Sequence, residues 1–89
     1  MPKSFHAQIL TPSGKLFDGE VTGVQLPGAE GRFEVLYGHA KIVSILDAGQ
    51  VRIRVPGKED RLFDVEGGVV EVEDNQLTLL AESAAVAAG

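Results

Sequence analysis

The chain has 89 residues and a mass of 9.4 kDa, with 44% hydrophobic and 24% charged residues, a composition that suits one folded domain and excludes a disordered chain. Thirteen acidic residues oppose eight basic ones, and the resulting net charge of −5 is opposite in sign to that of proteins that bind a phosphate backbone. We therefore expect no nucleic-acid partner, and the absence of cysteine excludes disulfides and thiolate chemistry.

Apolar and polar residues alternate with a period of two along the first part of the chain, which predicts short β-strands. Alternating segments lie at 5–9, 16–17 and 22–26, and turn-forming residues end each of them. The glycine-rich stretch 27–40 follows. We expect it to be a long structured loop, which either binds a partner or crosses between two sheets.

The second part of the chain repeats the strand pattern at 42–46, 51–55, 61–65, 69–73 and 76–80. Turn signals recur about every 8–12 residues, the spacing of an all-β sandwich or barrel, and no segment has the apolar period of a helix. We expect one β-sandwich domain over residues 1–82. The alanine-rich tail 83–89 is too short to form a helix alone and is expected to be frayed.

Two of these strands, 42–46 and 77–81, are apolar on both faces. A strand of a two-layer sandwich needs only one apolar face, so something must cover the second. Either another segment of this chain or a partner protein would do so, and the sequence leaves both open.

No arrangement of residues predicts catalysis, a cofactor or a metal. The two histidines, His6 and His39, are far apart in sequence, and no nucleophile elbow, calcium loop or phosphate-binding loop is present. No apolar run reaches the roughly 18 residues of a membrane-spanning helix, and the first residues do not form a signal peptide. We expect a soluble, non-secreted protein that is not an enzyme by itself.

An ordered set of short motifs resembles the epsilon subunit of F-type ATP synthases. The most specific are LPGAEGRF at 26–33, followed by VL at 35–36 and GHA at 38–40. Others agree in order: ILTP at 9–12, LFDGEV at 16–21, GQVRI at 49–53, EGGVVEV at 66–72 and LTLLAESA at 77–84. The resemblance covers nearly all of residues 5–84.

The resemblance implies a flattened β-sandwich of about ten strands that belongs to the rotating central stalk and performs no chemistry. Such a domain holds the gamma subunit and the c-ring together, at the cytoplasmic face of a bacterial plasma membrane. By this resemblance Glu30, Gly31 and Arg32 would face the c-ring, and His39, Ile42 and Ile45 would face gamma. Neither a cofactor nor bound ATP is implied.

The chain departs from the family pattern at Glu34, Tyr37 and Lys41, where the family has glycine and two prolines. Losing both prolines frees the backbone around residues 38–39. Typical members also continue into a two-helix hairpin that inhibits ATP hydrolysis, and no segment of these 89 residues matches it.

A second interpretation is a carrier domain of the biotinyl or lipoyl type, because such domains are also acidic, all-β and small. They present a lysine at a hairpin tip, and Lys58 lies in a predicted turn. Its neighbours, Gly57 and Glu59, are not the methionine or aspartate that such domains commonly have there.

Overall fold

The computed structural model describes residues 3–87, which form eight β-strands and no helix. The all-β prediction is confirmed. The strands are β1 (Phe5–Thr11), β2 (Gly14–Val21), β3 (Gly23–Gly28), β4 (Gly31–Val35), β5 (Ile42–Arg54), β6 (Arg61–Glu73), β7 (Gln76–Ala81) and β8 (Ala84–Val86).

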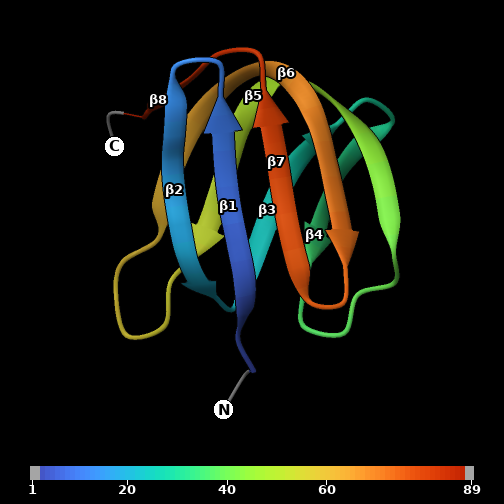
Figure 1. Ribbon diagram of the computed structural model, residues 1–89, viewed down its shortest axis with the longest axis vertical. Coiled ribbons are helices and arrows are strands. Elements are labelled where there is room, and N and C mark those ends of the chain that lie inside the picture. The colour runs from blue at the N-terminus through green and yellow to red at the C-terminus, as the bar shows by residue number, and fades with distance from the viewer. Residues whose placement is uncertain (1–2, 88–89) are drawn as a thin grey trace.

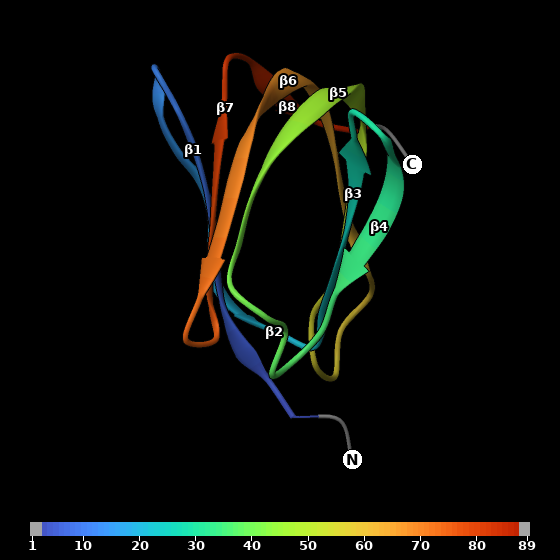
Figure 2. The same cartoon turned by 90° about the vertical axis from the view of Figure 1, so that its right-hand side faces the viewer.

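All eight strands belong to one continuous sheet in the order β2-β1-β7-β6-β5-β3-β4, and β8 pairs with β6. The sheet folds over on itself because β5 and β6 are each 13 residues long and bend from one layer into the other (Figures 1 and 2). Layer 1 contains β2, β1 and β7 with residues 68–73 of β6 and 42–46 of β5. Layer 2 contains β4, β3 and β8 with residues 48–54 of β5 and 61–66 of β6. Eight strands thus fill ten strand positions, close to the number expected.

Glycines permit the bends that carry β5 and β6 between the layers. Gly67 has a φ of 116°, and a Cβ on Gly68 would clash with the Leu80 carbonyl oxygen of β7. Gly49 lies under Pro27, whose ring leaves no room for a Cβ there. The sequence predicts turns at these places, which would split each long strand in two. This prediction is wrong, because pairing between β5 and β6 continues through both bends.

The core lies between the two layers, where alternate residues of the strands meet, as a period of two requires. Its largest fully buried side chains are Phe63, Ile9, Leu26, Ile53, Leu77 and Leu79, with valines from both layers around them. Phe17 meets Phe63 edge-to-face with ring centroids 6.0 Å apart, and the Arg61 guanidinium covers both rings. Arg61 thereby shields this aromatic pair at the edge of the core.

The expectation of a frayed tail is wrong for residues 84–86. They form β8, which pairs with β6 at Phe63, Asp64 and Val65, and Ala84 packs against the core. Backbone pairing to an otherwise free edge outweighs the weak helical preference of alanine in so short a segment. Residues 88–89 of the expected tail lie outside the described residues.

The stretch expected to be one long loop, 27–40, is only partly a loop. It contains the end of β3, a tight hairpin at Ala29 and Glu30, and the whole of β4. Only residues 36–41 are irregular, and they cross from layer 2 to layer 1, as one of the two expectations proposed. Gly31, with a φ of 132°, permits the hairpin.

Candidate interaction surfaces

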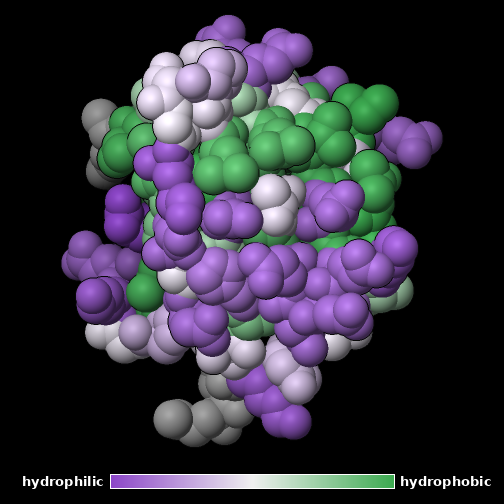
Figure 3. All heavy atoms as spheres, in the orientation of Figure 1, coloured by the Kyte–Doolittle hydropathy of each residue, from purple (hydrophilic) through white to green (hydrophobic). Residues whose placement is uncertain are grey.

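The outer face of layer 1 carries a row of apolar side chains that runs across four strands. Strand register aligns Leu10 of β1 with Leu80 of β7, Leu80 with Val69 of β6, and Val69 with Ile45 of β5. Val43 lies two residues along β5 on the same face. We call these five residues the apolar row. Figure 3 shows it as the hydrophobic band in the upper half of this face.

Most of the apolar row is open to solvent. The exposed fractions are 67% for Ile45, 65% for Val43, 53% for Leu80 and 37% for Val69. Single exposed apolar residues are ordinary on a protein surface, but a contiguous row marks an interaction site. No segment among residues 3–87 covers these side chains, so the chain's own described residues do not provide the second cover that the sequence called for.

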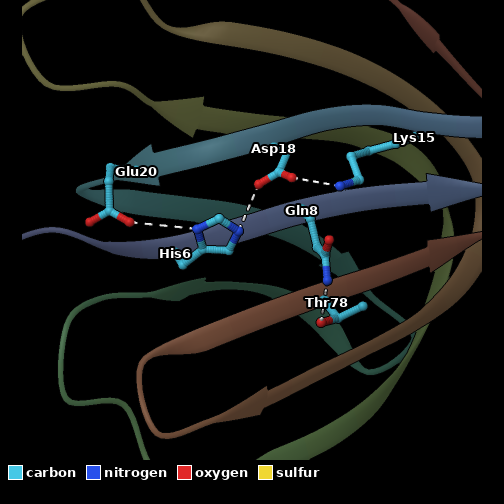
Figure 4. A network of polar contacts seen from close by, with 6 residues as sticks. All are labelled: His6, Gln8, Lys15, Asp18, Glu20 and Thr78. Atoms are coloured by element: carbon cyan, nitrogen blue, oxygen red, sulfur yellow. Dashed lines mark hydrogen bonds and ion pairs between the residues drawn. The ribbon is translucent and has the colours of Figure 1, made fainter.

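Polar side chains occupy the other half of the same face (Figure 4). His6 Nε2 lies 2.7 Å from an Asp18 carboxylate oxygen, and His6 Nδ1 lies 3.6 Å from Glu20 Oε2. Lys15 Nζ contacts the other Asp18 oxygen at 2.6 Å, and this hydrogen bond lowers the pKa of Asp18 below its ordinary value. The two His6 contacts join β1 to β2, and the whole network makes this half hydrophilic.

The structure places Glu30, Gly31 and Arg32 at the exposed tip of the hairpin between β3 and β4. The turn between β3 and β4 lies at the end of the sandwich at the upper right of Figure 1. The tip carries one negative and one positive charge two residues apart, and neither makes an ion pair within residues 3–87. This tip is free to meet a charged partner.

The three residues expected to face gamma are not brought together. His39 lies in the loop 36–41 at the opposite end of the molecule from the hairpin tip, where its Nδ1 lies 2.8 Å from the Ala40 carbonyl oxygen. Ile42 is half-buried and packs against the core, whereas Ile45 points outward. Of the three, only Ile45 belongs to the apolar row.

Contacts with the strands of layer 1 hold the loop 36–41 in place. The Gly38 amide donates to Asn75 Oδ1 at 2.7 Å, and Lys41 Nζ lies 3.1 Å from Glu73 Oε2. Asp74 and Asn75 have φ values of 51° and 59°, the left-handed conformation of a tight hairpin turn between β6 and β7. The loop is therefore anchored despite the missing prolines.

The apolar row also includes residues that the sequence analysis did not select as site residues: Leu10, Val43, Val69 and Leu80. The doubly apolar strands 42–46 and 77–81 pointed toward Val43 and Leu80, and no signal pointed toward Leu10. Val69 gave a weaker signal, because it lies next to another valine and either could face inward. Within residues 3–87 no cluster of three potential metal ligands and no helix able to span a membrane is found.

Similarity to known proteins identifies the family of this chain, which the surface alone does not. A model of the ATP synthase delta/epsilon chain beta-sandwich domain matches residues 4–87. The chain belongs to this family. The epsilon chain of Chlorobium limicola is 41% identical over 80 residues, which cover 90% of this chain and 91% of that relative. The epsilon chain of Caulobacter vibrioides is 43% identical over 83 residues, with 93% and 95% covered.

Other ATP synthase epsilon chains are longer. That of Rhodopseudomonas palustris is 39% identical over 85 residues, which make up only 62% of its length. The fold recurs in chains of two solved mitochondrial ATP synthases at 20% identity. The Euglena gracilis chain gives a TM-score of 0.88 and the Tetrahymena thermophila chain 0.76, with 97% and 96% of this chain and 55% and 68% of those chains covered. The epsilon-chain family leaves the carrier-domain interpretation, with its lysine at position 58, without support.

Proposed function

We propose that this chain is the non-catalytic central-stalk subunit of an F-type ATP synthase. It links the gamma subunit to the c-ring and so couples ion-driven rotation to ATP synthesis, at the cytoplasmic face of a bacterial plasma membrane. Its family and the names of its bacterial relatives support this role. One of the solved structures with the same fold is a central stalk with its c-ring.

The single observation that carries the proposal is the uncovered apolar row. A chain of this size has few apolar residues to spare, yet it leaves Val43, Ile45 and Leu80 in water. A stalk subunit is permanently assembled, so such a row is covered in the complex. We assign the row to gamma, with an interface of about 800 Å² on each partner. The charged hairpin tip at Glu30 and Arg32 is assigned to the c-ring loops.

A binding measurement with purified gamma subunit tests the assignment. Ile45→Glu places a charge in the centre of the contact, and we expect affinity for gamma to fall at least about a hundredfold, because an unpaired buried charge costs several kcal/mol. Val86→Glu is the matched control, since Val86 is 60% exposed but lies on β8 in layer 2. Equal affinity of the two variants would remove gamma from the apolar row.

A further inference from the structure

The half of β5 that carries Val43 and Ile45 is a free edge of the sheet. The Ala29 amide donates to the Ile45 carbonyl oxygen at 3.0 Å, so the backbone groups of Ile45 point away from β6. Residues two apart on a strand point the same way, so those of Val43 do too. Among residues 3–87 no strand lies beside the Val43 amide and carbonyl or the Ile45 amide. Figure 2 views this edge, with β3 and β4 in the opposite layer.

The other free edges of the sheet are protected against pairing with another chain. The β2 edge carries Lys15, Asp18 and Glu20, the β4 edge carries Arg32 and Glu34, and β8 is only three residues long. Charged side chains and short strands are the usual means of keeping an edge unpaired. The edge at 42–45 has neither, and its outward side chains are β-branched and apolar. Among the described edges it alone is suited to accept a strand.

Space for a strand lies next to this edge. The tip of the β3–β4 hairpin stands across from residues 43–45, and the two enclose a groove of about 660 Å³. The groove is lined by residues 28–33 on one side and 43–45 on the other. An extended segment entering it would meet the free backbone groups of β5 on one side and continue the apolar row on its outer face.

Charge around the groove indicates what kind of segment fits. Glu71 lies directly across from Val43 on the same face, whereas Glu30 and Arg32 on the opposing hairpin carry opposite charges that offset each other. Glu71 makes no ion pair among the described residues. A second copy of this chain would bring its own net charge of −5 against the Glu71 carboxylate. A strand of another protein that carries a lysine or arginine beside its apolar residues is the complementary occupant.

We propose that gamma, in addition to covering the apolar row, adds an extended strand to β5 at residues 43–45 and so lengthens layer 1 by one strand. This inference rests on the proposed function. The strand donates to the Val43 carbonyl, accepts from the Val43 and Ile45 amides, and places a basic side chain within reach of Glu71, while the Ile45 carbonyl keeps its bond from the Ala29 amide. Main-chain pairing of this kind gives affinity, and the adjoining side chains give specificity.

Val43→Pro is the variant that separates backbone pairing from side-chain contact. The Val43 amide points outward with no partner in the described residues, so proline removes a donor to gamma and leaves the β5–β6 ladder intact. Val43→Ala is the matched control for loss of the side chain. We expect Val43→Pro to bind gamma about tenfold more weakly than Val43→Ala, because the carbonyl of gamma that faces residue 43 loses its hydrogen-bond donor.

A second measurement does not depend on any variant folding. Backbone amide exchange of the wild-type chain, free and bound to gamma, reports each amide separately. We expect the Val43 and Ile45 amides to exchange rapidly when free and slowly in the complex. Sedimentation of the chain alone, with and without Val43→Pro, tests a second copy as the occupant, and we expect a monomer in both.

The outcomes are distinct for the two proposals. Wild-type binding to gamma with equal affinities of the two variants, or without protection of the two amides, would overturn strand addition and leave the proposed function standing. Failure of the wild-type chain to bind gamma would overturn both. Self-association that Val43→Pro abolishes would assign the edge to a second copy and also overturn strand addition.

Discussion

At the scale of single residues, Asp18 is the most informative titratable group. Lys15 and then His6 stabilise its charged form, so its pKa in the folded chain lies below the ordinary value of 3.8. A carboxyl whose pKa is lowered on folding stabilises the protein at pH values above its pKa in the unfolded chain, and this contribution is lost as the pH falls through its pKa in the folded chain.

We expect Asp18→Asn to lower the melting temperature slightly at pH 6 and to match the wild type near pH 2. A pH series of thermal unfolding, with Asp47→Asn as the exposed control, measures the difference. A gap between Asp18→Asn and wild type that stays constant down to pH 2 would contradict the lowered pKa.

The sequence could not show which residues of the strand 42–46 face outward, for a definable reason. A strand with apolar residues on one face shows which face is buried, but 42–46 is apolar on both, so its phase is not determined by the pattern. Ile42 and Ile45 are three residues apart, and an odd spacing places them on opposite faces. The structure resolves the phase through register: Ile42 pairs with buried Val72, and Ile45 pairs with exposed Val69.

At the scale of elements, the bend of β6 holds the two layers together. A Cβ at Gly68 would meet the Leu80 carbonyl oxygen and lie 3.0 Å from Ala81 Cα, both of which are backbone atoms that cannot move aside. We expect Gly68→Ala to reduce the free energy of unfolding by about 3 kcal/mol. Gly57→Ala is the control, because Gly57 has a φ of 72° but open space around it, and only the backbone strain of about 1–2 kcal/mol applies. Urea unfolding of both variants measures their free energies of unfolding. Equal losses of free energy in the two variants would show that crowding at the bend is unimportant.

The strands themselves could be predicted from the sequence, but the way they connect could not. Alternation located β1 to β3 and β5 to β7 but not β4 or β8, since it reflects the local requirement for one buried face. Residues 47–49 and 67–68 carry the same glycine signals whether the chain reverses there or bends into the other layer. Only pairing across the sheet, from Leu46 with Gly68 to Ala48 with Glu66, distinguishes these cases. Likewise β8 exists because β6 offers it an edge, and nothing in residues 84–86 indicates that partner.

At the scale of the whole molecule, the two proposed contacts use different parts of a domain that measures 32 × 27 × 23 Å. The apolar row lies across the outer face of layer 1, whereas the β3–β4 turn that carries Glu30 and Arg32 lies at one end of the sandwich (Figure 1). The contacts differ in chemistry as well, one apolar and one charged. A rotor linker needs this separation, because it must hold both partners at once.

Charge reversal at the hairpin tip tests that separation. We expect Glu30→Lys and Arg32→Glu each to weaken attachment to the c-ring about tenfold, and ATP-driven proton pumping to fall accordingly. Exposed charges contribute little to folding, so melting temperatures should change by less than about 4 °C. Glu59→Lys, in the loop at the opposite end, controls for a change of net charge alone.

The two reversals also distinguish between two kinds of electrostatic contact. If only the net charge of the tip mattered, Glu30→Lys and Arg32→Glu would act in opposite directions, and one of them would strengthen pumping. If each side chain has its own partner on the ring, both reversals place like charges together and both weaken it. We expect the second pattern, because Glu30 lies in a two-residue turn and Arg32 in the paired strand that follows it, where the backbone has little freedom. Unchanged pumping in both variants would assign the c-ring contact to another part of the sandwich.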